Sequence, residues 1–275
     1  MQFASPSTAP ALAKNDNPFA GVRWNGWLIF IIAVVCILAF VCVQLILTVF
    51  IILRDNPEIL QRGFLDPEMQ RKVTNPSYFI ALLNAKNLWL LSVFSEGVLA
   101  LGTLLLARLL LDASARSLGF RGRPSSEKLA IGLSVGIGLF IASSLVGALL
   151  TKIFGPHPQP QALALLKHHG AFDFLLDFMA VGMIAPIAEE IFFRGFIFAG
   201  LAQRMDPRFA MVSSALLFGL AHLEKWSFLS IFVIGVGLAW LYYRTQNLWV
   251  NIVAHGTVNT ISLILAFTVP QLVKS

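Results

Sequence analysis

The stretch WLIFIIAVVCILAFVCVQLILTVFIIL, residues 27–53, decides the class of fold. Gln44 and Thr48 are its polar interruptions. A bilayer core about 30 Å thick is crossed by roughly 20 apolar helical residues, because each residue adds about 1.5 Å. The stretch is too long for the apolar core of a signal peptide and has no small-residue cleavage site. It therefore predicts a retained transmembrane helix.

The composition of the whole chain agrees with this prediction. Of its 275 residues, 57% are hydrophobic and 12% are charged, whereas a soluble domain has about 45–50% apolar and about 25% charged residues. Such a chain has too little polar surface to cover a water-soluble globule. A soluble enzyme, a disordered chain and a secreted disulfide scaffold are therefore excluded in favour of a membrane protein.

Further apolar stretches predict an all-α polytopic bundle of seven to eight transmembrane helices. We expect them over residues 27–53, 88–111, 129–150, 174–201, 209–223, 228–243 and 248–267, with an eighth if the segment around 78–85 enters the membrane. In the third stretch, Gly132, Gly136 and Gly138 would let a neighbouring helix approach closely. Polar segments are expected to form a disordered tail (1–25), a connection with short helices (54–87) and a loop with a surface helix (151–170).

The basic residues lie mainly between the apolar stretches. Lys and Arg number 20 against 14 Asp and Glu, so the net charge is +6. Basic loops beside membrane helices contact anionic lipid headgroups, and no basic stripe interleaved with aromatics predicts nucleic-acid binding. Their distribution slightly favours an N-terminus inside the cell. Cys36 and Cys42 share one apolar stretch and form neither a disulfide framework nor a metal motif.

Polar side chains inside the apolar stretches carry the functional information. An ionisable group at mid-membrane costs at least about 2.5–3.5 kcal/mol, so it is usually paired or functional. Five places qualify: Glu96; Glu189 with Glu190 and Arg194; His222; His255 with Asn259; and Asp173 with Asp177. No role is assigned to Glu96, because Arg108 would lie about 18 Å away along the same helix.

The strongest of these places is AEEIFFRG, residues 188–195. Glu190 precedes Arg194 by four residues, the favourable order for an ion pair on one helix face. Adjacent α-helical residues point about 100° apart, so we expect Glu189 and Glu190 not to share a partner. Glu189 has no cation at its own i+4 position and is a candidate general base in an apolar surrounding. The alternative is that both glutamates only pair with basic groups on other helices.

Two histidines and an asparagine extend this cluster. His222 ends the fifth apolar stretch, where a lone His is more often interfacial than catalytic. His255 and Asn259 share one helix face through their i,i+4 spacing, and an interhelical hydrogen-bond clip is the simpler alternative for them. Counting along the helices does not bring His222 and His255 to one depth, so their meeting depends on helix tilt.

Together these side chains predict a site that activates water. A carboxylate and a His can deprotonate a water molecule, while a second His and an Asn stabilise an oxyanion. Alternatively, Glu189, His222 and His255 supply the ligands of a catalytic zinc site. Neither the His-Glu-x-x-His segment of soluble metalloproteases nor a Gly-x-Ser-x-Gly motif occurs in the sequence.

The pattern resembles one known family. P-x-x-E-E-x-x-F-R-G at 186–195, F-x-x-x-H at 218–222 and H-x-x-x-N at 255–259 look like the three-motif signature of the CPBP intramembrane proteases. This family includes CAAX prenyl endopeptidases of the Ras-converting type, bacteriocin-processing or immunity proteins and abortive-infection proteins. YRTQNLW at 243–249 is also similar to the family, and the resemblance covers residues 174–267.

The resemblance implies a helical membrane core that encloses a polar cavity and hydrolyses peptide bonds. The implied site residues are Glu189 and His222 for water activation, His255 and Asn259 for the oxyanion, and Glu190 and Arg194 for holding the geometry. Family members are often described as metalloproteases, and a metal-free glutamate mechanism, which we slightly favour, fits the same residues. The chain would then comprise a tail (1–26), N-terminal helices (27–170) and a CPBP-like core (171–270).

The main hypothesis is therefore a multi-pass intramembrane endopeptidase of a bacterial cytoplasmic membrane. Its expected partners are membrane lipids and a peptide or protein substrate, with a prenylated CAAX-type substrate as one option. One alternative is a non-catalytic membrane partner or immunity protein of the same fold. Another is a transporter that relays protons through Glu and His, although no inverted repeat is visible between the halves.

Overall fold

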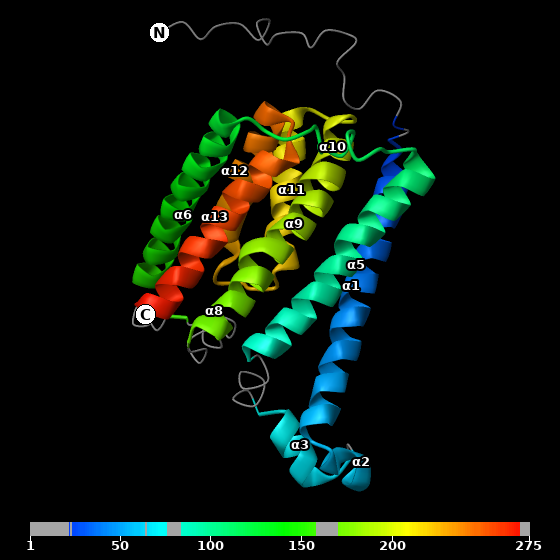
Figure 1. Ribbon diagram of the computed structural model, residues 1–275, viewed down its shortest axis with the longest axis vertical. Coiled ribbons are helices and arrows are strands. Elements are labelled where there is room, and N and C mark those ends of the chain that lie inside the picture. Colours follow the sequence, from blue (N-terminus) through cyan, green and yellow to red (C-terminus); the bar gives the residue numbers. More distant parts are fainter. Residues whose placement is uncertain (1–21, 23, 64, 76–83, 158–169, 270–275) are drawn as a thin grey trace, which may run out of the picture.

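The computed structural model describes residues 22, 24–63, 65–75, 84–157 and 170–269, and every regular element within them is a helix. The elements in chain order are α1 (Gly26–Asp55), α2 (Glu58–Arg62), α3 (Pro67–Val73), α5 (Ala85–Leu111), α6 (Ser126–Phe154), α8 (Ala171–Asp177), the π-helix η2 (Phe178–Ile184), α9 (Ala185–Glu189), the π-helix η3 (Glu190–Phe198), α10 (Ala199–Ala202), α11 (Pro207–Ala221), α12 (Phe228–Thr245) and α13 (Leu248–Thr268) (Figure 1).

The predicted all-α membrane bundle is confirmed. Six helical stretches are long and apolar enough to cross a membrane: α1, α5, α6, the continuous stretch Ala171–Ala202, α12 and α13. The fifth predicted helix, α11, is present but has 15 residues. It is about 22 Å long at 1.5 Å per residue, less than the bilayer core of about 30 Å. The short helices expected after the first span are α2 and α3.

Three expectations fall wholly or largely outside the described residues. The candidate eighth span (around 78–85) and the loop with a surface helix (151–170) fall largely on residues 76–83 and 158–169, and the tail lies mostly in residues 1–21. They stay predictions from sequence, as does the orientation of the N-terminus.

Polar side chains fix where the long helices begin. The side chains of Asn25, Asn84, Ser125, Asp206 and Asn247 each accept hydrogen bonds from backbone N–H groups in the first turn of the helix that follows. Such N-caps satisfy donors that have no partner within the helix. The apolar stretches therefore start as helices at defined residues.

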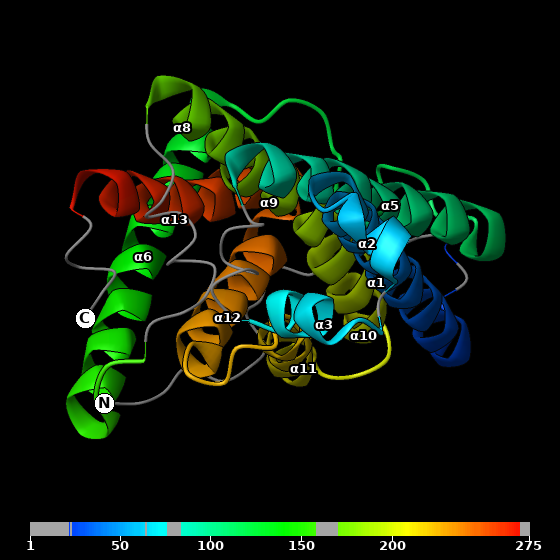
Figure 2. The same ribbon diagram turned by 90° about the horizontal axis from the view of Figure 1, so that it is seen from below.

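The stretch Ala171–Ala202 lies between two groups of helices. On one side α5 packs against it and against α1, and on the other side α13 packs against it and against α6 (Figures 1 and 2). In addition, α12 packs against α6 and α11. The central stretch thus presents its side chains to α5 and α13 together.

This central stretch is not the regular α-helix that the sequence predicts. Its π-helical parts, η2 and η3, flank the short α-helix α9. π-Helical hydrogen bonds run from i to i+5, are rare and are frequent at functional sites. Glu189 ends α9 and Glu190 begins η3, so the two carboxylates lie where the helix changes its geometry.

Glycines let α6 approach α13 closely, as the sequence predicts for two of the three. A Cβ on Gly136 would lie 2.5 Å from the carbonyl oxygen of Ala254, and one on Gly132 would lie 2.7 Å from that of Val250. Nothing lies within 4 Å of a Cβ on Gly138. Only Gly132 and Gly136 are therefore required for this contact.

We expect Gly136→Ala to destabilise the bundle, because the added methyl group meets backbone atoms that cannot yield. An overpacked contact costs about 1–3 kcal/mol, which thermal unfolding of the purified protein in detergent measures. Gly138→Ala is the matched control and should be neutral or slightly stabilising, since Ala favours helix over Gly. Equal losses for the two variants would contradict the close approach of α6 and α13.

Candidate active site

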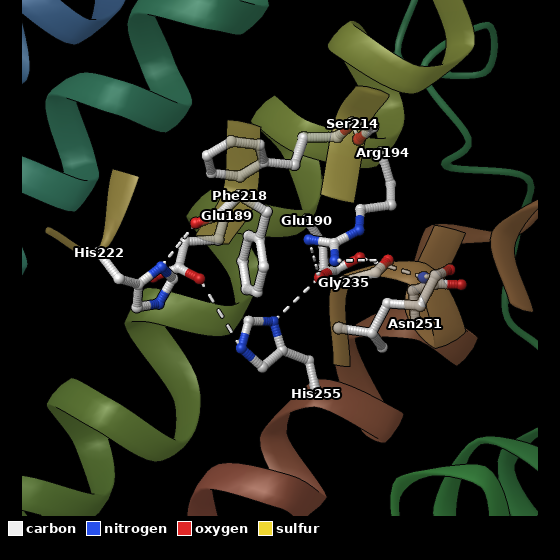
Figure 3. Close-up of polar contacts among 11 residues, drawn as sticks. Glu189, Glu190, Arg194, Ser214, Phe218, His222, Gly235, Asn251 and His255 are labelled. Atoms are coloured by element: carbon white, nitrogen blue, oxygen red, sulfur yellow. Dashed lines mark hydrogen bonds and ion pairs between the residues drawn. The ribbon is translucent and has the colours of Figure 1, made fainter. Parts of the chain in front are cut away.

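Glu190 is the centre of a buried polar network. Its side chain is fully buried, and its carboxylate contacts Nη1 of Arg194 at 2.9 Å and Nδ1 of His255 at 2.9 Å (Figure 3). Nδ2 of Asn251 also donates to it at 3.1 Å. The Glu190–Arg194 ion pair that the i,i+4 spacing predicts is thus present. Asn251 and His255, both on α13, complete the polar contacts of Glu190.

Arg194 is fully buried, as is Glu190. Its Nη2 donates to the carbonyl oxygen of Gly235 on α12 at 3.4 Å, and its guanidinium lies 4.3 Å from the centre of the Phe218 ring. A buried charge is costly unless it is paired and hydrogen-bonded, and an aromatic face adds a favourable cation–π contact. Arg194, held by Glu190, therefore joins η3 to α11 and α12.

His255 bridges the two adjacent glutamates. Its Nδ1 faces Glu190, and its Nε2 lies 3.7 Å from Oε2 of Glu189 (Figure 3). The expectation that the two glutamates cannot share a partner is therefore wrong. An imidazole has nitrogens on two edges, so one ring on α13 reaches carboxylates that point in different directions.

Phe218 separates the two histidines. The centre of its ring is 4.8 Å from that of His222 and 5.7 Å from that of His255, both edge to face. Nδ1 of His222 lies 2.8 Å from the carbonyl oxygen of Phe218, one turn earlier. This contact favours the tautomer in which Nδ1–H donates and Nε2 carries a free electron pair.

A cavity of about 340 Å³ joins His222 to the last helix. It is lined from α6 by Phe140, Ser143 and Ser144, from α11 and its C-cap by Phe218 and His222, from α12 by Ile231 and Ile234, and from α13 by His255, Val258, Asn259 and Ser262. His222 and His255 thus face one space, although counting along the helices does not predict a common depth. The tilt and packing of α11 and α13 bring them together.

Asn259 lines the cavity but stands apart from the ionic network. Its Nδ2 donates to the carbonyl oxygen of Val181 on η2 at 2.9 Å. This hydrogen bond joins α13 to the central stretch. Asn259 thus forms the interhelical hydrogen-bond clip that the sequence analysis gives as the alternative to a catalytic role. An amide NH₂ has two hydrogens, so a second N–H remains for another acceptor.

Asn251 belongs to the network and is absent from the sequence-based site. It is fully buried and donates to Glu190 and to the carbonyl oxygen of Leu238 on α12. A signal was available, because Asn251 precedes His255 by four residues and shares its helix face. Asp173 and Asp177, by contrast, lie on α8 and do not line the cavity.

The residues as placed do not fit a zinc site. Within the described residues, no group of three or more His, Cys, Asp or Glu side chains converges in a way that could hold a metal ion. Both nitrogens of His255 already face carboxylates, and Nδ1 of His222 faces a backbone carbonyl.

A buried Glu-His-Glu-Arg network thus lies beside a polar cavity among apolar helices. The model of the Rce1-like type II CAAX prenyl endopeptidases matches residues 171–261. The chain is 30% identical over 191 residues to "Putative membrane peptidase YdiL" of Bacillus subtilis, which covers 67% of this chain and 73% of that protein. The chain belongs to the Rce1-like type II CAAX prenyl endopeptidase (CPBP) family.

A second relative is more distant. "UPF0177 protein YxdF" of Lactococcus lactis subsp. lactis is 28% identical over 91 residues, 33% of this chain and 50% of that protein. No solved structure matches the chain significantly. The family resemblance inferred from the three motifs is confirmed, and the chain is a multi-pass membrane protein with a bacterial relative.

Proposed function

We propose that the chain is an intramembrane endopeptidase that hydrolyses a peptide bond in the cavity between α6, α11, α12 and α13. The observation that carries the proposal is the placement of His222, His255 and Asn259 around one cavity, with His255 tied to Glu189 and Glu190. The two histidines and the amide line the cavity, and Glu189, the proposed base, lies 3.7 Å from Nε2 of His255.

Glu189 would activate the water. Its Oε2 is buried and has no hydrogen-bond partner within the part of the chain that the structure describes, so it is available to accept a proton. Nε2 of His222, with its electron pair, would accept a hydrogen bond from the same water and orient it. The oxygen then attacks the scissile carbonyl carbon while the water's proton passes to Glu189.

His255 and Asn259 would stabilise the oxyanion that forms. His255 lies between the two carboxylates, its Nε2 edge would donate to the oxyanion, and Asn259 would offer its second N–H. When the tetrahedral intermediate collapses, the carbon–nitrogen bond breaks and Glu189 returns its proton to the leaving amine. The products are a carboxylic acid and an amine, and the site is restored.

The shape of the cavity supports an extended peptide segment as the substrate. A second cavity of about 300 Å³ shares Ser143, Ile231 and Ile234 with the first and continues to Trp226 and His157. The two cavities form a path along α6 and α12, lined by both apolar groups and hydroxyls. We infer a membrane-associated peptide or protein substrate at the cytoplasmic membrane of a bacterium, with lipid-modified CAAX-type segments as one class to test.

Cleavage of internally quenched peptides by the purified full chain tests this function. The panel contains peptides with and without a prenylated cysteine near the C-terminus. We expect cleavage by the wild type and a loss of about 10²–10⁴-fold for His222→Ala, because the variant lacks the group that orients the water. Leu223→Ala, at the exposed neighbouring residue, is the matched control and should cleave normally. Unchanged cleavage by His222→Ala would overturn this site, and a wild type inactive on every peptide would favour a non-catalytic membrane partner.

A further inference from the structure

The helix α12 begins without the side-chain cap that α1, α5, α6 and α13 have. Ser227 occupies its N-cap position, but the Ser227 backbone is helical (φ −94°, ψ −7°) and its side chain accepts no hydrogen bond from the first turn, residues 228–231. The caps of the other four helices have extended backbones and hydrogen-bonded side chains. The first-turn N–H groups of α12, which have no acceptor within the helix, therefore receive none from Ser227.

The hydroxyl group of Ser227 is also buried without a partner. The residue is 8% exposed, and its Oγ makes no hydrogen bond within the part of the chain that the structure describes. Ser227 lines the second cavity, of about 300 Å³, together with Ser230 and Thr151. A buried polar group without a hydrogen bond calls for an explanation. A ligand in this cavity that accepts hydrogen bonds would supply the missing partner.

Positive charge gathers at the same place. The N-terminus of an α-helix carries a partial positive charge, and α12 has no acidic residue in its first turn, residues 228–231. Nζ of Lys225 lies 5.0 Å from the centre of the Trp226 ring, which lines the cavity and stacks on the ring of His157. The last turn of α6 adds Lys152, and the loop before α12 also contains Glu224. Among the described charges of these two segments, positive exceeds negative.

We propose that the N-terminus of α12 binds a carboxylate group of the peptide substrate, through the Ser227 hydroxyl, the first-turn N–H groups and the charge of Lys225. Helix N-termini bind carboxylates and phosphates in this way, and hydrogen bonds to an ionised acceptor are the strong ones. A peptide is the source because the second cavity shares Ser143, Ile231 and Ile234 with the catalytic cavity. The inference rests on the proposed function, since the bound group belongs to the peptide that is cleaved.

The position of this carboxylate site predicts where the charge lies in the substrate. Ser227 precedes Ile234 by seven residues, about 10 Å along α12 at 1.5 Å per residue. Ile234 lines the catalytic cavity together with His222 and His255. An extended peptide covers about 3.3–3.6 Å per residue, so the carboxylate should lie about three residues from the scissile bond. Both a free C-terminus and the side chain of Asp or Glu provide such a group.

Internally quenched peptides that differ in a single carboxylate test the site. The series contains a peptide with a free C-terminus three residues after the scissile bond, the same peptide as a C-terminal amide, and amides with an Asp three residues before or after the bond. For the wild type, kcat/KM should be about tenfold higher for one carboxylate version than for the plain amide, the typical contribution of a hydrogen bond to a charged group. The version that shows the gain identifies the source of the carboxylate.

Two substitutions of Ser227 should change this preference. Ser227→Ala should lower the carboxylate-to-amide ratio of kcat/KM about tenfold, and Ser227→Asp should reverse the preference because like charges repel. Ser125→Ala and Lys128→Gln are the matched controls, since the start of α6 lies at the opposite end of the bundle (Figure 1), and both should keep the wild-type ratio. Ser125→Ala removes a helix cap and should lower the unfolding temperature, whereas Ser227→Ala removes none and should leave the unfolding temperature nearly unchanged.

Equilibrium binding separates this site from the proposed function. Fluorescence anisotropy of labelled peptides on the Glu189→Gln protein, with and without Ser227→Ala, needs no cleavage. A carboxylate peptide that binds more tightly than its amide, and loses this advantage in Ser227→Ala, supports the site even if the wild type cleaves no peptide, a result that would refute the peptidase alone. Cleavage with equal kcat/KM for all versions, or an unchanged ratio in Ser227→Ala, overturns the carboxylate site alone. Equal binding of all versions without any cleavage refutes both.

Discussion

Replacing Glu189 by Gln should abolish peptide cleavage. The amide has nearly the same size and can still pack beside His255, but it cannot take a proton from water. General-base catalysis contributes about 10²–10⁴-fold to a rate, so kcat should fall by at least that factor with little change in KM. Initial rates on the best quenched peptide of the panel, measured over a range of concentrations, separate the two constants.

Glu127→Gln provides the matched control for this experiment. Glu127 is exposed in the first turn of α6, away from the site, and carries the same change of charge. It should cleave at the wild-type rate, and both variants should unfold at similar temperatures. A Glu189→Gln protein that is folded and cleaves like the control would remove Glu189 from the mechanism.

Replacing Arg194 by Met should destabilise the folded bundle more than Gly136→Ala does. Met fills a similar volume, but the Glu190 carboxylate then remains buried without its cation. Breaking a buried ion pair costs about 3–5 kcal/mol, because an uncompensated charge is left in the interior. Thermal or chemical unfolding of the purified protein in detergent reports this loss directly.

The double variant Glu190→Gln with Arg194→Met separates charge from packing. Removing both charges should restore much of the lost stability, since replacing a buried pair by neutral groups is often tolerated. Arg208→Met, at an exposed position on α11, controls for the loss of a guanidinium and should be nearly neutral. A double variant no more stable than Arg194→Met would show that packing, and not the unpaired Glu190 charge, causes the loss.

The helical layout was predictable because the membrane helices are long and apolar, and several of them begin at a polar cap. The stretch at residues 248–267, for instance, begins after Asn247, whose side chain caps α13. In lipid, every backbone polar group must be satisfied within its own helix. Each membrane helix can therefore be predicted from its own stretch of sequence. The Glu190–Arg194 pair was equally predictable, because it depends on spacing within one element.

Contacts between elements were not predictable in the same way. The π-helical parts of the central stretch leave no mark on hydropathy, and the bridging of Glu189 and Glu190 by His255 depends on how α13 packs against it. Asn251 has the right spacing from His255, yet only the position of Glu190 gives its amide a partner. Spacing along one helix indicates which residues share a face, while their partners depend on tertiary packing.

The buried network has a consequence for an enzyme that works in an energised membrane. Glu190 and Arg194 form a buried ion pair in which one negative and one positive charge lie 2.9 Å apart. A membrane potential does work on a net charge, about 2.3 kcal/mol per elementary charge for each 100 mV, but very little on a compact group whose charges cancel. The bundle can therefore hold this buried ion pair while the membrane potential does very little work on it.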